Sequence, residues 1–190
     1  MAVSISSFTE AMSRVPAPVT VATTVTPDGR SWGFTASSFC SLSLRPPLIL
    51  LCLAKEAESH LAFTRAGSFL INVLAAEHAP VALHFARRSH RKVATSGFVP
   101  CEKGLPGLPE ATARVACSTH SVVAGGDHSI IVGLVESTYV SDRIPLSYCD
   151  RAFARPTPLG PDDAGPRKEH DDPHSQGTAD LARRDRLRSR

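Results

Sequence analysis

The stretch Gly33-Phe34-Thr35-Ala36-Ser37-Ser38-Phe39-Cys40-Ser41-Leu42-Ser43 combines a glycine with five hydroxyl side chains. Short hydroxyl side chains and neighbouring backbone N–H groups can hydrogen-bond a phosphate or an aromatic heterocycle without steric obstruction. A polar strand with one solvated face is the alternative interpretation. The stretch therefore indicates either a ligand-binding strand end or the exposed face of a sheet.

The segments around this stretch carry the alternating pattern of β-strands. Residues 19–25 alternate in this way, and the turn Pro27-Asp28-Gly29-Arg30 predicts a hairpin. Strands are predicted at residues 31–35, 37–43, 48–53, 69–74, 113–123 and 129–139, and helices at residues 8–15, 59–66 and 77–85. Ser7 is the expected cap of the first helix. Because strands and helices do not alternate regularly, we expect a mainly β protein, an antiparallel barrel with peripheral helices.

Two further segments carry side chains suited to a binding site. His128 follows Gly125-Gly126-Asp127 and precedes an apolar strand, where its imidazole can reach a cleft and donate a hydrogen bond. A histidine in a surface turn is the alternative. The basic run from Arg87 to Lys92 suits a phosphate, or is a solvated loop.

The composition excludes several classes of protein. Of the 190 residues, 42% are hydrophobic and 21% are charged, which is typical of a globular domain. The longest apolar run, residues 48–54, is too short for a membrane span, and the first residues lack the apolar core of a secretion signal. A net charge of +3 is too small to indicate nucleic-acid binding. We therefore expect neither a membrane nor a nucleic-acid partner.

The cysteines and the missing motifs narrow the chemistry further. Five scattered cysteines without a CxxC pair argue against a disulfide framework or a zinc site and favour a cytoplasmic protein. The histidines are dispersed, so no metal site is expected. The dinucleotide fingerprint GxGxxG, the phosphate loop and the GxSxG and HExxH signatures are absent.

The composition changes near Arg155. Residues 156–190 contain five prolines, no aromatic residue and seven acidic and seven basic side chains. Such a segment buries too little apolar surface to offset its ordering entropy. The sequence predicts one domain over residues 1–155 and a disordered, charged, proline-rich tail over residues 156–190.

Taken in order, these segments resemble the flavin reductase family, which includes the reductase components of two-component flavin-dependent monooxygenases. The resemblance rests on the Gly-x-Thr-Ala-Ser-Ser-Phe-x-Ser-Leu-Ser pattern from Gly33, on Pro46-Pro47-Leu48 with its apolar strand, and on Gly126-Asp127-His128. Phe69-Leu70-Ile71-Asn72-Val73-Leu74 is similar to another strand of the family. The resemblance to this family implies a split β-barrel of the FMN-binding type that forms a homodimer.

The resemblance also implies which residues form the site. It assigns flavin contacts to the hydroxyl-rich stretch, to the loop after the apolar strand, to the end of the third helix and to the closing strand 145–153. The residues concerned are Thr35, Ala36, Ser37, Ser38, Ser41, Cys52, Ala54, Lys55, Ser59, Phe85, Ala86, Arg87, Lys92 and Tyr148. The loop containing Lys55 and Ser59 would approach the flavin phosphate. His128 is assigned to the nicotinamide side as the catalytic residue.

The implied activity is reduction of FMN or FAD by NADH or NADPH, with the reduced flavin passed to a partner oxygenase. The chain departs from the family in the closing strand, where Arg151 is displaced and the usual glycine is missing. A non-catalytic flavin-binding or flavin-sensing protein, and a one-component flavoprotein on the same fold, are the alternatives.

Overall fold

The computed structural model describes residues 3–87, 93 and 96–160. The first compact unit of the chain is Met1–Pro156 and the second is Thr157–Arg190. In the second unit, residues 157–160 are described and adopt neither helix nor strand. The tail predicted from the composition lies mostly outside the described residues.

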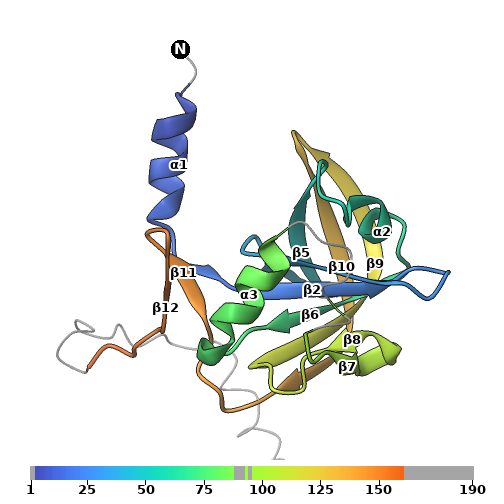
Figure 1. Cartoon of the computed structure of the whole chain (residues 1–190). Helices are drawn as coiled ribbons and strands as arrows, with labels where there is room; N and C mark the ends of the chain where they lie inside the picture. The colour runs from blue at the N-terminus through green and yellow to red at the C-terminus, as the bar shows by residue number, and fades with distance from the viewer. Residues whose placement is uncertain (1–2, 88–92, 94–95, 161–190) are drawn as a thin grey trace, which may run out of the picture. The chain divides into compact units, whose positions relative to one another are not determined.

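The first unit is built around an antiparallel sheet that has seven strands within the described residues. They are β2 (Thr20–Val25), β3 (Ser31–Ala36), β4 (Cys40–Leu44), β5 (Pro47–Ala54), β6 (Ser68–Val73), β9 (Ala113–Gly125) and β10 (His128–Val140). Their order is β3-β2-β6-β9-β10-β5-β4. Figure 1 shows β2 and β6 running across the direction of β5, β9 and β10, so the sheet is strongly curved. The predicted mainly β fold, a split barrel with peripheral helices, is confirmed.

The two edge strands of this sheet, β3 and β4, are neighbours in the sequence. Residues 37–39 connect them, and β3 is in contact with β5. The chain therefore crosses from one edge of the curved sheet to the other in three residues. We call this junction the seam. It explains why β4 begins at Cys40, three residues after the predicted start of that strand.

Every second side chain of β5 fills the interior of the curved sheet. Ile49, Leu51 and Leu53 are buried and pack in one cluster with Phe69 of β6 and Ile131 of β10. Residues two apart on a strand point to the same face, so a strand of this pattern supplies a row of side chains to one core. The apolar run predicted as a strand thus forms a central part of the barrel.

Helices cover this sheet on two sides. The helix α2 (His60–Thr64) contributes Phe63, whose ring meets that of Phe34 edge-on with centroids 4.8 Å apart. The helix α3 (Ala79–Ala86) follows the 3-10 turn η1 (Ala76–His78) and packs Ala82 and Phe85 against Val21. Both helices lie where the sequence predicts helices.

The N-terminal helix α1 (Ile5–Ser13) begins earlier than predicted. Ser4, not Ser7, is its cap, and the Ser4 hydroxyl accepts a hydrogen bond from the Ser7 N–H at 3.1 Å. None of the residues of α1 is buried, and Ile5, Phe8 and Met12 expose half or more of their surface. The helix therefore presents an apolar face that the described residues of its own chain leave uncovered.

The closing segment is a hairpin, not the single strand expected. The strands β11 (Ser147–Cys149) and β12 (Ala152–Ala154) pair with each other, and β11 also pairs with β1 (Ala17–Pro18). Asp150 and Arg151 form the turn with φ of 53° and 61°. Figure 1 shows α1 extending from this small sheet, and Arg151 reaches Glu10 of the helix at 2.7 Å.

A smaller element covers the lower part of the sheet. It consists of β7 (Val99–Pro100), the 3-10 turn η3 (Glu102–Gly104) and β8 (Pro106–Gly107). Arg114 of β9 holds it through a Glu102 ion pair at 2.9 Å. Within the described residues, no helix has the length and apolarity required to cross a bilayer.

Candidate functional site

A cavity of about 460 Å³ opens beside the seam, between the ends of β3 and β5 and the end of α3. The predicted residues that line it are Thr35, Ala36, Ser37, Ser38, Cys52, Ala54, Ser59, Phe85, Ala86, Arg87 and His128. They come from segments far apart in the sequence. The structure thus brings most of the predicted site into one place, and their contacts with a ligand stay a prediction.

Ser38 ties the two walls of the cavity together. Its hydroxyl accepts a hydrogen bond from the Cys52 N–H at 2.9 Å and donates one to the Cys52 carbonyl at 3.2 Å. The side chain therefore takes the place of a neighbouring strand at this point of β5. Its one hydroxyl proton is used, so Ser38 can offer a ligand its oxygen lone pair or its backbone N–H.

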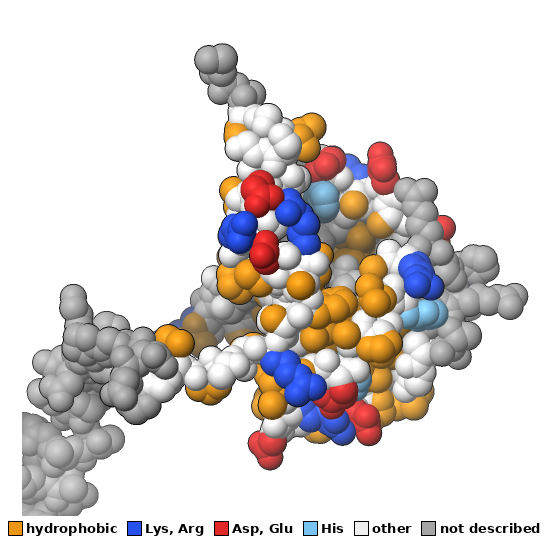
Figure 2. Space-filling model, turned by 60° about the vertical axis from the view of Figure 1, so that its left-hand side comes forward, with side chains coloured by type: hydrophobic (Ala, Val, Ile, Leu, Met, Phe, Trp, Pro, Cys, Tyr) orange, Lys and Arg blue, Asp and Glu red, His pale blue; other side chains and the backbone are white. Residues whose placement is uncertain are grey.

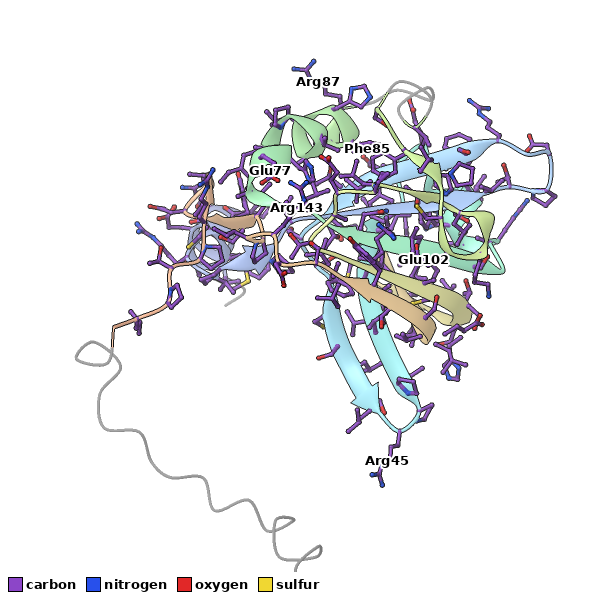
Figure 3. The ribbon with its side chains drawn as sticks, turned by 90° about the horizontal axis from the view of Figure 1, so that it is seen from below. Arg45, Glu77, Phe85, Arg87, Glu102 and Arg143 are labelled. Atoms are coloured by element: carbon purple, nitrogen blue, oxygen red, sulfur yellow. The ribbon has the colours of Figure 1, made fainter. Side chains whose placement is uncertain are left out.

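Thr35 is also committed to the protein. Its hydroxyl donates to the Ala82 carbonyl of α3 at 2.7 Å, which fixes the helix against β3. Figure 3 shows Phe85 on the inner side of α3 and Arg87 beyond the end of the helix. The ring of Phe85 is buried and forms part of the cavity wall. α3 therefore shapes one side of the cavity and places Arg87 at its edge.

His128 stands on the opposite side, at the first residue of β10. It pairs with Ala54 of β5 and with Gly125 of β9, so the strand ladder fixes its position. The Nδ1 atom of His128 lies 2.8 Å from an Asp127 carboxylate oxygen. This hydrogen bond from His128 lowers the pKa of the Asp127 carboxyl below its ordinary value. Because a carboxylate only accepts, Nδ1 carries the proton and Nε2 is left for a ligand.

Three predicted residues do not line this cavity. Lys55 turns its ammonium group to the Gly126 carbonyl at 2.6 Å. Ser41 lies exposed on β4, opposite Ile49. Tyr148 pairs with Ala17 on β11 and packs against Phe153 at a centroid distance of 5.5 Å. Lys92 lies outside the described residues.

The cavity also has lining residues that sequence reasoning missed. They are Trp32, Gly33, Phe34, Leu53, Glu56, Ala57 and Glu58. Four of the seven, Phe34, Leu53, Glu56 and Glu58, adjoin predicted residues in the sequence, so a ligand that touches the backbone of one also meets its neighbour. The acidic side chains of Glu56 and Glu58 nevertheless gave no signal for a flavin site.

A second cavity of about 730 Å³ lies between the β2–β3 turn and the β7–β8 element. Its lining includes Arg30, Phe98 and Pro106 and none of the predicted site residues. Among the described residues, no group of three or more His, Cys, Asp and Glu side chains could hold a metal ion. The cavity beside the seam is therefore the candidate active site.

An antiparallel split barrel with a cavity where its edge strands meet defines the class of fold. The sequence model of the flavin reductase like domain matches residues 12–157, and the chain belongs to that family. The resemblance seen in the sequence is confirmed.

Curated relatives cover most of the same region. The chain is 43% identical over 146 residues to the actinorhodin polyketide dimerase of Streptomyces coelicolor, covering 76% of this chain and 82% of that protein. It is 35% identical to the NADH:riboflavin 5'-phosphate oxidoreductase of Streptomyces pristinaespiralis, covering 82% and 90%. The stachydrine N-demethylase reductase subunit Stc3 of Rhizobium meliloti is longer: at 37% identity, the match covers 78% of this chain and 64% of that one.

A solved structure agrees with the fold. The NADH:FAD oxidoreductase SgcE6 of Streptomyces globisporus, in complex with NAD and FAD fragments, matches with a TM-score of 0.75 and 33% identity. The match covers 80% of this chain and 92% of that one. The similarity therefore extends over nearly the whole first compact unit.

Proposed function

We propose that this chain is an NADH:flavin oxidoreductase that reduces FMN or FAD and releases the reduced flavin to a separate oxygenase. The observation that carries the proposal is the cavity in which the hydroxyl-rich end of β3, the end of β5 and His128 face one another. The relatives named for reduction of flavins with NADH support it.

The lining of the cavity fits a flavin. Its volume lies within the roughly 300–1,000 Å³ of small-molecule sites. Ser59 lines the cavity although the residue as a whole is 5% exposed, so its hydroxyl is a polar group that a bound flavin could reach. The backbone of residues 35–38 and the ring of Phe85 would hold the flavin ring system.

When bound, a flavin supplies the ring nitrogen N5, which takes up the hydride from C4 of a reduced nicotinamide. The protein has to hold the two rings in register and exclude other reactants. His128 would orient the nicotinamide through Nε2, because Asp127 holds its Nδ1. Ser38 keeps the walls of the cavity at a fixed separation through Cys52. No protein nucleophile is needed.

Purified chain mixed with NADH and free flavin tests the proposal. We expect steady loss of nicotinamide absorbance that requires added FMN or FAD. Flavin binding without turnover would favour the alternative of a non-catalytic flavin-binding protein. Turnover with a flavin that co-purifies and stays bound would favour a one-component flavoprotein. Running NADPH beside NADH identifies the preferred donor.

We also propose that the chain works as a homodimer. Apolar side chains stay exposed on the described part of a single chain, among them Ile5 and Phe8 of α1 and Leu44 of β4. Figure 2 shows hydrophobic side chains gathered on the face that α1 adjoins. A second copy would remove this surface from water. Sedimentation should give about twice the mass of one chain, and an active monomer would contradict the proposal.

We also propose an oxygenase partner and a cytoplasmic location. A relative named as a reductase subunit of an N-demethylase supports an oxygenase component as the recipient of reduced flavin. All five cysteines lie in the described part of the chain and are free, which suits a reducing cytoplasm. Neither a membrane nor a nucleic acid is proposed as a partner. Titrating the oxygenase encoded nearest to this chain into the NADH assay, with its substrate, tests the transfer.

A further inference from the structure

The loop that follows β5 lines the cavity with negatively charged residues, which would repel a phosphate. It was expected to approach the flavin phosphate through Lys55, yet the residues that line the cavity there include Glu56 and Glu58. What these two carboxylates imply rests on the proposed function and concerns which flavin the site holds most tightly.

Lys55 is held away from the cavity by two bonds. Its backbone N–H donates to the Asp127 carbonyl at 2.9 Å, and its ammonium group donates to the Gly126 carbonyl at 2.6 Å. The lysine thus links the loop to the β9–β10 turn and carries its positive charge to that turn. Residues 56 and 58 then stand on the cavity side of the same loop.

A polar part of the ligand would lie beside Ser59 and Glu58, which are neighbours in the lining of the cavity. A hydroxyl or amide of a ligand can donate a hydrogen bond to a carboxylate at this position. A phosphate dianion has no proton to donate, and two carboxylates repel its charge.

The cation of the cavity lies on another element. Arg87 is the one arginine or lysine among the described residues that line the cavity. It lies beyond the end of α3 (Figure 3). The loop and the helix end therefore carry opposite charges. A phosphate at the helix end is attracted by Arg87, whereas one at the loop meets Glu56 and Glu58.

We propose that Glu56 and Glu58 act as specificity residues that weaken binding of a flavin phosphate and favour a neutral, hydroxyl-bearing part of the ligand at this loop. The ribityl chain of a flavin has that chemistry. The chain then holds FMN less tightly, relative to riboflavin, than it would with neutral side chains at positions 56 and 58. A loosely held flavin also suits a protein that hands it on.

The test compares FMN with riboflavin, which differ by the phosphate alone. Dissociation constants are measured by flavin fluorescence for the full chain and for the Glu56→Gln/Glu58→Gln variant. We expect FMN to bind about tenfold more tightly to the variant at low salt, because two like-charge interactions are removed. Riboflavin affinity should change less than about twofold. The gain for FMN should shrink as salt is added.

A matched control removes two negative charges elsewhere. Glu110 and Asp142 do not line the cavity, and the contact of Glu110 with Arg143 is an exposed pair at 3.5 Å. The Glu110→Gln/Asp142→Asn variant should leave the ratio of the two affinities unchanged. Equal changes for FMN and riboflavin, or no change for FMN, would overturn the proposal. Binding of both flavins without NADH oxidation would instead contradict the proposed function. The ratio of FMN to riboflavin affinity would still decide whether Glu56 and Glu58 set the flavin preference.

Discussion

Gly33 faces the ring of Phe85 so closely that a Cβ atom at position 33 would lie 2.6 Å from Cε1 of that ring. Phe85 is buried and lines the candidate active site, so it cannot turn aside freely. The missing side chain of Gly33 is therefore what allows α3 to lie against β3 and complete the cavity wall.

The Gly33→Ala variant should lose about 1–3 kcal/mol of stability, which is typical of overpacking a core. Flavin affinity should fall as well, because the wall formed by Phe85 moves. Denaturant unfolding and flavin titration measure the two effects. Gly67→Ala is the control, since a Cβ there meets no atom within 4 Å and its φ is not positive. Equal stability of the two variants would contradict the close packing.

Ser38→Ala should remove both hydrogen bonds to Cys52 and cost about 1–3 kcal/mol, because the partner groups of β5 are left unsatisfied. Flavin affinity should fall with stability. Ser38→Thr keeps the hydroxyl and should restore most of both. Ser41→Ala, on the exposed strand β4, serves as the control. A Ser38→Ala variant with wild-type unfolding and weaker flavin binding would instead make Ser38 a direct ligand.

His128→Ala should separate binding from turnover. Loss of alignment between nicotinamide and flavin can cost up to about 100-fold in rate. Flavin Kd should change less than about threefold, because the hydroxyl-rich stretch lies on another wall. Stopped-flow reduction of the flavin-loaded variant by NADH measures the rate. His120→Ala, exposed on β9, is the control. Wild-type rates and saturation in His128→Ala would show that this histidine is an ordinary turn residue with no role in the reaction.

Stability should depend on pH through His78. Burial lowers the pKa of this histidine, and its Nδ1 accepts a hydrogen bond from the Ala75 N–H at 3.1 Å. Its unfolded pKa, about 6.5, is the higher one, so the unfolded chain binds the proton first. The contribution is complete above about pH 6.5 and is lost as the pH falls toward the lowered folded value.

Thermal unfolding of the wild type and of His78→Asn between pH 8 and 5 checks this sign. Tm of the wild type should fall more steeply below about pH 6.5 than Tm of the variant. Parallel curves would show that His78 does not contribute to the acid sensitivity.

Removal of residues 157–190 should leave Tm and flavin affinity nearly unchanged. The reason is compositional, because residues 156–190 contain no aromatic residue and few large aliphatic ones. Differential scanning fluorimetry of the chain ending at Pro156 makes the comparison. A drop of several degrees on truncation would show that the tail contributes to the fold.

Most of the barrel was predictable because its strands are apolar or β-branched runs bounded by turn residues. The apolar run at β5 and the long strands β9 and β10, which flank the turn at Gly125 and Gly126, lie where the sequence predicts them. The closing hairpin was not predictable, because Asp150 and Arg151 form a left-handed turn that sequences usually mark with glycine or asparagine. Here the Asp150 N–H donates to Ser13 and Arg151 pairs with Glu10, contacts made 137 or more residues away in the sequence.

The site was predictable as a set of segments and less so as a set of side-chain roles. The resemblance placed Thr35 and Ser38 at the site, but it could not show that their hydroxyls are bonded to Ala82 and Cys52. Nor could it show that Lys55 turns to Gly126. Side-chain direction depends on partners brought in by the fold, and a single sequence does not record them.

Because of the seam, flavin binding should report whether the strands of this sheet open together or one by one. Because β3 and β4 are the two edges of one continuous sheet, release of any strand between them separates the walls on which Ser38 and Cys52 lie. A flavin would then bind the closed sheet and no partly opened form. At a hundredfold excess over Kd it would stabilise that closed state by about 2.7 kcal/mol. Amide exchange on β6 or β9, remote from the cavity, should slow as much as exchange at the cavity itself.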